Sequence, residues 1–177
     1  LEVARIESGK ETLTETAWNL CNLEDTLDLL LDRDIYKKQL TLKKNMELQH
    51  PKVYCDVLKI QEITMNLLSN AVKYTPEGGT IHFTIRELPY EREGYALFQT
   101  VVEDTGIGIS KEYIPHLFEA FSREKSSSES GIIGTGLGLR IVKKFVDLME
   151  GSIVVESEIG EGTRFTVTIP HRIATAN

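Results

Sequence analysis

A strand-like segment ends in Glu103-Asp104-Thr105-Gly106-Ile107-Gly108-Ile109, where one carboxylate is followed at once by two glycines. The preceding residues 95–102 alternate and then become apolar, which is typical of a partly buried strand. The glycines allow a sharp turn and let a ligand approach the backbone closely. The Asp104 carboxylate would then accept a hydrogen bond from an exocyclic amine such as that of adenine. Taken alone, the pattern also fits an ordinary turn at the end of a strand.

A second glycine motif stands directly before a segment with helical periodicity and reads Gly134-Thr135-Gly136-Leu137-Gly138-Leu139. In that segment one face collects Leu139, Val142, Val146 and Met149. Glycines that open a helix leave its first amides free to bind a phosphate, which the helix dipole also favours. The spacing fits neither the dinucleotide fingerprint nor the phosphate loop that ends in Gly-Lys-Ser/Thr. A glycine hinge at the start of a helix is the alternative.

Residues 56–74 form a predicted amphipathic helix, whose apolar stripe consists of Ile60, Ile63, Leu67 and Ala71. A continuous polar edge runs along its other side and contains Lys59, Glu62, Asn66, Asn70 and Lys73, with Tyr74 beside Asn70. Asparagine is unfavourable in a helix interior, so two of them on one edge need a reason. Amide oxygens are hard ligands of the kind that magnesium takes together with phosphates and water. The alternative is a solvated polar face.

Several motifs follow one another in order over most of residues 56–170. They read Asn70-Ala-Val-Lys73-Tyr74-Thr-Pro-Glu-Gly-Gly, Asp104-Thr-Gly-Ile-Gly-Ile, Ile114-Pro-His-Leu-Phe118-Glu-Ala-Phe121, Gly134-Thr-Gly-Leu-Gly-Leu and a closing Gly160-Glu-Gly-Thr163-Arg-Phe165. This order resembles the catalytic ATP-binding domain of sensor histidine kinases. The wider superfamily includes gyrase-type, heat-shock chaperone and mismatch-repair ATPases. The resemblance implies a Bergerat-type ATP-binding fold, with ATP and Mg²⁺ as cofactors.

The resemblance also implies a role for each matching residue. Asn70 would bind the magnesium ion, Asn66 would assist on the metal or the phosphates, and Lys73 would reach the phosphates. Tyr74 would stack against the adenine, and Asp104 would accept a hydrogen bond from the adenine amino group. The other nucleotide contacts are expected from Gly106, Gly108, Ile109, Phe118, Arg123, Gly134, Thr135, Gly136, Leu137, Gly138, Leu139 and Thr163.

Asn66 bears on the type of reaction. The ATPase relatives carry a glutamate at this position to activate water, and an amide cannot act as that base. We therefore expect Asn66, Asn70 and Lys73 to be the catalytic residues of an ATP:protein-histidine phosphotransferase in two-component signalling. Two alternatives stay open: an ATP hydrolase of the gyrase or chaperone type, and a non-catalytic nucleotide sensor.

Composition and resemblance divide the chain into three parts. Residues 1–10 resemble the end of the second helix of a histidine kinase dimerisation hairpin, residues 11–172 the catalytic domain, and residues 173–177 a tail. Residues 122–131 are rich in serine and charge and are expected to form a nucleotide-dependent lid. The acceptor histidine is expected in the absent first helix of the hairpin. None of the four histidines present fits the acceptor motif, and each is expected to fill surface or core: His50, His82, His116 and, near the tail, His171.

Composition limits the partners and the compartment. A net charge of −7 and the lack of a basic patch argue against nucleic acid. Two cysteines are too few for a zinc site or a disulfide framework, which favours a reducing compartment and a cytoplasmic domain. No apolar run of 18 residues is present, although a membrane anchor upstream stays open. The expected partners are the chain's own hairpin in a homodimer, and a receiver domain or response regulator.

The order of predicted elements favours an α/β (α+β) two-layer sandwich. Strands are expected near residues 15–20, 40–47, 52–54, 80–87, 95–103, 152–157 and 163–169, and helices near 23–36, 56–74, 111–118 and from the second glycine motif to 149. The charged turn at residues 89–94 predicts a hairpin. Adjacent antiparallel pairs exclude a doubly wound parallel sheet. We expect a mixed, largely antiparallel sheet covered on one face by about three helices.

Overall fold

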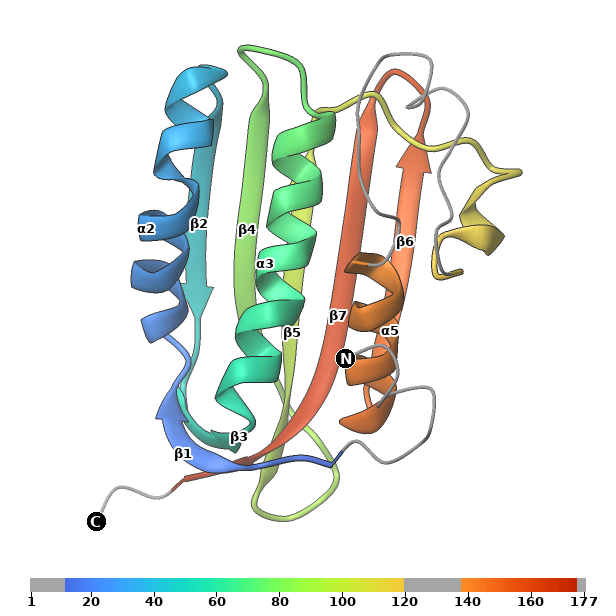
Figure 1. Ribbon diagram of the computed structural model, residues 1–177. Coiled ribbons are helices and arrows are strands. Elements are labelled where there is room, and N and C mark those ends of the chain that lie inside the picture. Colours follow the sequence, from blue (N-terminus) through green and yellow to red (C-terminus); the bar gives the residue numbers. More distant parts are fainter. Residues whose placement is uncertain (1–11, 120–137, 175–177) are drawn as a thin grey trace.

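The computed structural model describes residues 12–119 and 138–174, which form two layers (Figure 1). One layer is a seven-stranded sheet. The other lies on a single face of that sheet and contains α2 (Asn22–Lys37), α3 (Val57–Tyr74) and α5 (Gly138–Leu148). The predicted two-layer class is therefore confirmed. In the described residues no helix is both long and apolar enough to cross a membrane.

The sheet is mixed, and its strands follow the order β1-β3-β7-β5-β4-β2, with β6 paired to β7. Their bounds are Thr16–Asn19 (β1), Thr41–Glu47 (β2), Lys52–Cys55 (β3), Thr80–Leu88 (β4), Tyr95–Asp104 (β5), Ser152–Glu158 (β6) and Gly162–Ile173 (β7). The predicted β4–β5 hairpin and the closing β6–β7 hairpin both form. The pair β2–β4 is parallel, whereas the other recorded pairs are antiparallel.

The helix α3 begins at a side-chain cap and buries the predicted stripe. The Asp56 carboxylate accepts from the Lys59 amide at 3.2 Å and from the Thr14 amide at 2.9 Å. Burial opposes the ionisation of Asp56, but these amides and the Lys59 ammonium outweigh it and lower the pKa of the carboxyl. The stripe packs against the sheet. The core between the two layers contains the fully buried side chains of Leu67 and Leu68 from α3, Phe145 from α5, and Phe83 and Val102 from the sheet. Each such side chain contributes about 1.5–3 kcal/mol by leaving water.

The predicted helix over residues 111–118 is wrong. Only a single 3₁₀ turn, η1 (Ile114–His116), forms there. Its backbone hydrogen bonds span three residues: the His116 amide donates to the Tyr113 carbonyl oxygen at 2.8 Å, and the Leu117 amide donates to the Ile114 carbonyl oxygen at 3.2 Å. In an α-helix beginning at Lys111, the amide of residue 115 would donate to the Lys111 carbonyl oxygen, and Pro115 has no amide, so the predicted helix is interrupted there.

The last strand is longer than predicted. β7 continues to Ile173 and pairs with Val53 and Tyr54 of β3, beyond its pairing with β5. His171, expected near the tail, is therefore buried within the sheet and 5% exposed. Its alternation with Ile169 and Ile173 places it on the helix-covered face.

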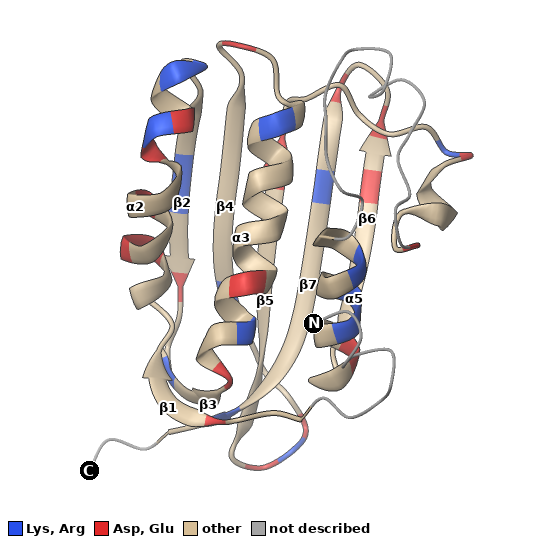
Figure 2. Cartoon of the chain, viewed as in Figure 1, with Lys and Arg blue, Asp and Glu red and all other residues tan. Residues whose placement is uncertain are grey.

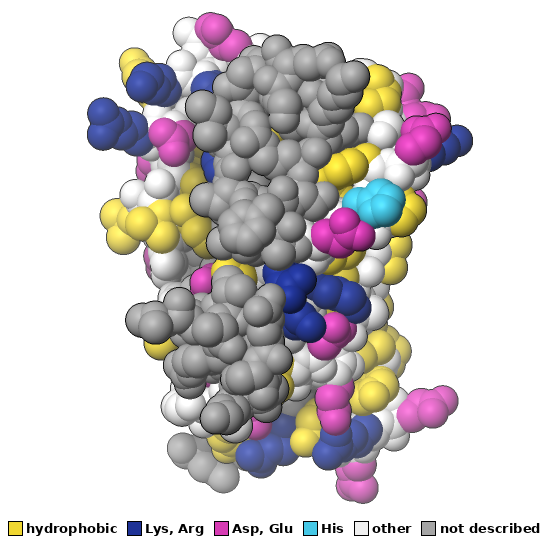
Figure 3. All heavy atoms as spheres, turned by 45° about the vertical axis from the view of Figure 1, so that its right-hand side comes forward, with side chains coloured by type: hydrophobic (Ala, Val, Ile, Leu, Met, Phe, Trp, Pro, Cys, Tyr) yellow, Lys and Arg dark blue, Asp and Glu magenta, His cyan; other side chains and the backbone are white. Residues whose placement is uncertain are grey.

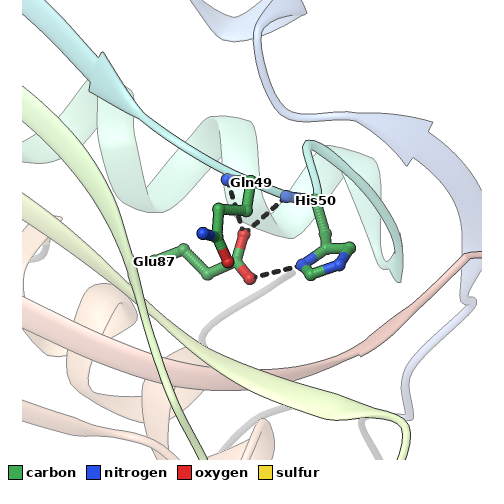
Figure 4. A network of polar contacts seen from close by, with 3 residues as sticks. All are labelled: Gln49, His50 and Glu87. Carbon is green, nitrogen blue, oxygen red and sulfur yellow. Dashed lines mark hydrogen bonds and ion pairs between the residues drawn. The ribbon is translucent and has the colours of Figure 1, made fainter.

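The connection between β2 and β3 is held by one carboxylate of β4, Glu87 (Figure 4). Its oxygens accept from the amides of Gln49 and His50 at 3.0 and 2.7 Å and contact His50 Nδ1 at 2.6 Å. Burial opposes the ionisation of Glu87, but these hydrogen bonds lower its pKa. His50 thus has a structural role in this turn.

Candidate functional site

The polar edge of α3 forms one side of the site. Asn66, Asn70 and Tyr74 are half-buried there, and Lys73 is exposed near the end of the helix. The Asn66 amide nitrogen donates to the Glu62 carbonyl oxygen at 2.8 Å. This bond satisfies the amide on the helix side and leaves its oxygen turned away from that carbonyl.

The start of α5 meets this edge. A Cβ added to Gly138, the first residue of α5, would lie 2.8 Å from Asn66 Oδ1. Only glycine lets the two helices approach this closely without moving Asn66. The first amides of α5 and the positive end of its dipole are therefore next to the polar edge of α3, where an anion is stabilised.

Basic side chains add to this attraction on the same side of the molecule. The helix α5 carries Arg140, Lys143 and Lys144. Figure 2 shows this basic charge on α5, and Figure 3, with that side turned forward, shows Lys and Arg side chains gathered near the centre of the face. A triphosphate approaching α5 would meet a favourable field.

Asp104 closes the opposite end of the site as the last residue of β5. The residue is 8% exposed, and its Oδ1 accepts from the Gly106 amide at 2.8 Å. Burial raises the pKa of Asp104 to about 6, opposed by hydrogen bonds from the backbone amides of Gly106 and Thr163. A carboxylate held in this way can accept a further hydrogen bond from a buried amine.

The loop after Asp104 docks onto the end of α3. The Ile107 amide donates to the Tyr74 carbonyl oxygen at 3.1 Å. A Cβ at Gly106 would lie 2.5 Å from that same oxygen and 2.7 Å from Asp104 Oδ1. The first glycine of the motif is thus required for the contact that brings Asp104 and Tyr74 together.

The second glycine of the motif packs against the β6–β7 turn. Gly108 has a φ of +78°, and a Cβ there would overlap the Glu158 carbonyl. Next to it the Ile109 amide donates to Ser157 Oγ at 2.8 Å, and Ser157 Oγ lies 2.8 Å from Thr163 Oγ1. This close backbone packing is a reason for glycine that the sequence interpretation did not include.

A groove of about 610 Å³ lies on the other side of the Asp104 segment. Besides Asp104 and one cation, Arg164, its lining includes four glutamates: Glu103, Glu156, Glu158 and Glu161. Those charges would repel a polyphosphate. The helix side of Asp104, between α3 and the start of α5, is therefore the side that suits a nucleotide.

The structure brings some of the predicted site residues together. A backbone hydrogen bond joins Tyr74 to the Asp104 loop, and the Asn66 side chain of α3 packs against Gly138 at the start of α5, where Leu139 follows. Phe118 is half-buried just after η1, and Thr163 is buried beside Asp104. Five predicted residues lie outside the described ranges: Arg123, Gly134, Thr135, Gly136 and Leu137. Phe121 and the predicted lid, residues 122–131, also lie outside them.

Thr105 is a structural residue of the site that the sequence interpretation missed. Its amide donates to the Thr80 carbonyl oxygen at 3.1 Å, and its hydroxyl accepts from the Thr80 amide at 3.0 Å. The pair ties the Asp104 loop to the start of β4. Its position between the carboxylate and the first glycine was the available signal.

The donor set suits a lightly held magnesium ion. Within residues 12–119 and 138–174, no group of three or more His, Cys, Asp or Glu side chains comes together to hold a metal. The amide oxygen of Asn70 would supply one hard ligand, and phosphates and water would supply the rest. The residues present therefore fit a magnesium ion that arrives with a nucleotide.

Comparisons with known proteins agree with this geometry. The family described as histidine kinase-, DNA gyrase B- and HSP90-like ATPase matches residues 55–173. The sensor protein GacS of Pseudomonas syringae pv. syringae is 37% identical over 171 residues, covering 96% of this chain and 18% of GacS. The autoinducer 2 sensor kinase/phosphatase LuxQ of Vibrio harveyi is 35% identical over 174 residues, covering 96% of this chain and 20% of LuxQ. The chain thus spans about a fifth of the length of these curated relatives.

Solved structures give the same result for the fold. Full-length ShkA in complex with AMPPNP matches with a TM-score of 0.81 at 26% identity, covering 99% of this chain and 35% of ShkA. A nucleotide-free catalytic domain of the histidine kinase ThkA matches with a TM-score of 0.72 at 26% identity, covering 89% of this chain and 98% of that domain.

Proposed function

The chain belongs to the histidine kinase-, DNA gyrase B- and HSP90-like ATPase family, and from that premise we propose that it transfers the γ-phosphate of Mg-ATP to a histidine. The acceptor would be a histidine on a dimerisation hairpin of the same protein. The observation that carries this proposal is the contact between the amide edge of α3 and the glycine start of α5, with Asn66 at the contact. A phosphoryl group placed there would face amide groups. At position 66 it would meet an asparagine and not a carboxylate that could act as a base.

The adenine end of the proposed site rests on Asp104 and Tyr74. The Asp104 carboxylate would accept a hydrogen bond from the adenine amino group, and the Tyr74 ring would stack on the base. Their relative position is fixed by the hydrogen bond from Ile107 to the Tyr74 carbonyl. Guanine presents a carbonyl oxygen at the corresponding edge, so Asp104 would select ATP over GTP.

The phosphate end rests on α3 and α5. Asn70 would supply an oxygen to magnesium, which would neutralise charge on the phosphates when bound. Lys73 would reach the phosphates from the last turn of α3, and the start of α5 would offer its free amides. Phosphoryl transfer depends mainly on such positioning and charge stabilisation.

Asn66 favours transfer to a protein over transfer to water. Its nitrogen is engaged with Glu62, and an amide does not accept a proton from water at neutral pH. The hydrolytic relatives carry a glutamate here. We infer that the bound γ-phosphate is held for an incoming histidine, with a receiver domain or response regulator as the next partner.

The test uses γ-labelled ATP and the 177-residue chain, alone and with an added dimerisation hairpin. The hairpin carries either its histidine or alanine at that position. We expect acid-labile label on the histidine hairpin alone, and a rate reduced about tenfold or more by Asn70→Ala, since lost positioning of one group has effects of this size. Rapid phosphate release by the chain without hairpin would support a hydrolase. No label and no release in any mixture would support a nucleotide sensor.

A further inference from the structure

Lys38, directly after α2, reaches across to the end of α3. Its Nζ donates to the Val72 carbonyl oxygen at 2.6 Å and to the Lys73 carbonyl oxygen at 3.2 Å. The last four carbonyls of an α-helix have no amide partner within the helix. A cation at this end also meets the negative end of the helix dipole. Lys38 therefore satisfies two of these carbonyls from a separate element.

The other two terminal carbonyls of α3 have partners as well. Ala71 O accepts from the Thr75 amide at 3.0 Å and from the Thr75 hydroxyl at 2.6 Å. Tyr74 O accepts from the Ile107 amide at 3.1 Å. The last turn of α3 is thus held by its own next residue, by the Asp104 loop and by Lys38.

The backbone next to Lys38 holds the chain that leaves α3. The Lys38 carbonyl oxygen accepts from the Gly78 amide at 3.0 Å, and the Thr41 amide donates to the Gly79 carbonyl oxygen at 2.9 Å. The turn between α2 and β2 is therefore joined by two hydrogen bonds to Gly78 and Gly79 in the α3–β4 connection. Burial lowers the pKa of the Lys38 ammonium.

We infer that Lys38 is a positioning residue for the nucleotide site. It fixes the last turn of α3, which carries Lys73 and Tyr74, although it does not itself reach the proposed position of the nucleotide. The inference rests on the proposed function, because Lys73 and Tyr74 matter here only if they bind ATP. Without Lys38 the turn would open part of the time, and the apparent dissociation constant would rise as the competent fraction falls.

The test compares Lys38→Met with Lys38→Arg and with Lys37→Met in the 177-residue chain. Lys37 is an exposed neighbour, so Lys37→Met removes one positive charge and leaves the Lys38 hydrogen bonds to α3 in place. Two quantities are measured: hydrogen exchange at the Thr75 and Ile107 amides without nucleotide, and the dissociation constant of Mg-AMPPNP by calorimetry.

For Lys38→Met we expect faster exchange at both amides and a dissociation constant about 3- to 10-fold higher, which corresponds to a competent fraction of about 10–30%. Lys38→Arg should restore most of the affinity, and Lys37→Met should match the wild type.

Unchanged exchange and unchanged affinity in a folded Lys38→Met would overturn the inference, as would an equal loss in Lys37→Met. If Lys38→Met does not fold, a wild-type-like Lys38→Arg supports the inference, and unprotected Thr75 and Ile107 amides in folded Lys38→Arg oppose it. Failure of the wild type to bind Mg-AMPPNP would refute the proposed function instead.

Discussion

At the scale of single residues, the ionised Asp104 carboxylate lowers the stability of the unliganded protein, although it is the group proposed to bind the adenine. The folded chain buries this carboxylate and raises its pKa to about 6, chiefly through loss of water. A carboxyl whose pKa is raised on folding adds stability at low pH, and that stability is lost as the pH rises through the folded pKa. At neutral pH the unliganded protein therefore bears a cost, which a bound amine would offset.

We predict that Asp104→Asn stabilises the unliganded protein relative to wild type more at pH 8 than at pH 4. The asparagine does not titrate, and its oxygen can still accept from the Gly106 amide. A shift of about two pH units corresponds to a change of about 2–3 kcal/mol in the stability difference. Urea unfolding of both proteins at the two pH values measures it.

The same substitution should weaken Mg-AMPPNP binding about 10- to 100-fold, because it replaces a charged hydrogen-bond acceptor with a neutral one. Glu103→Gln, a substitution of the exposed neighbouring carboxylate, serves as the control and should leave affinity unchanged within a factor of about two. In the unfolding experiment, a stability difference between wild type and Asp104→Asn that does not vary with pH would contradict the raised pKa of Asp104.

At the scale of elements, the glycines of the two motifs have different tasks. Gly108 is required by its own backbone, which has a φ of +78° and touches the backbone of Glu158. Gly138 is required only by a side chain, the amide of Asn66. The sequence shows only a glycine at each position, whereas the structure shows that Gly108 contacts backbone and Gly138 contacts a side chain.

We predict that alanine substitutions at these two glycines change the free energy of unfolding by very different amounts. Gly108→Ala should reduce the free energy of unfolding by about 2 kcal/mol or more, since it combines left-handed backbone strain with a backbone overlap. Gly138→Ala should change it by less than about 1 kcal/mol, because alanine favours a helix and Asn66 can rotate. Denaturant unfolding of both variants measures these free energies.

Gly138→Ala should still weaken Mg-AMPPNP binding several-fold, because the displaced Asn66 amide no longer faces the start of α5. Gly160→Ala is the control for left-handed glycines, because Gly160 has a φ of +84° with open space around its Cβ position. A Gly108→Ala protein no less stable than Gly160→Ala would show that the contact with Glu158 contributes nothing.

At the scale of the whole molecule, the buried His171 and Asp104 change the free energy of unfolding in opposite directions as the pH falls. Burial lowers the pKa of His171 to about 4, against a hydrogen bond with the backbone of Tyr54 that raises it. The ring also lies 5.6 Å from that of Phe98. A histidine whose pKa is lowered on folding reduces stability as the pH falls below its unfolded value.

We predict that wild type loses about 2 kcal/mol more stability between pH 7 and pH 5 than His171→Gln does. The unfolded chain binds a proton over that range, and the folded chain does not. Asp104 acts in the opposite direction over part of the same range. Urea unfolding of wild type, His171→Gln, Asp104→Asn and the double variant separates the two contributions.

If the His171→Gln curve runs parallel to wild type over this pH range, the histidine does not titrate as its burial implies. His82→Gln is a matched control, since His82 is exposed on the other face of the sheet. At pH 7 this exposed substitution should change the free energy of unfolding by no more than about 0.5 kcal/mol.

Local patterns in the sequence determined most of the elements of this protein. Alternation predicted β4 and β5, the charged turn between them predicted their hairpin, and helical spacing predicted the buried face of α3. Each pattern repeats every two or every three to four residues, so a short segment contains all the information required. The order of the motifs then led to the family. The helix expected at residues 111–118 failed where Pro115 broke the local pattern.

Only the tertiary structure decided how distant segments meet. It paired β2 with β4 in parallel, extended β7 past His171, set Gly108 against Glu158 and placed the Lys38 ammonium on the end of α3. These contacts join residues that lie 34 or more positions apart, and no periodicity within a segment specifies its partner. They are chosen by the joint packing of the sheet and its helices, in which buried polar groups have to find hydrogen-bond partners.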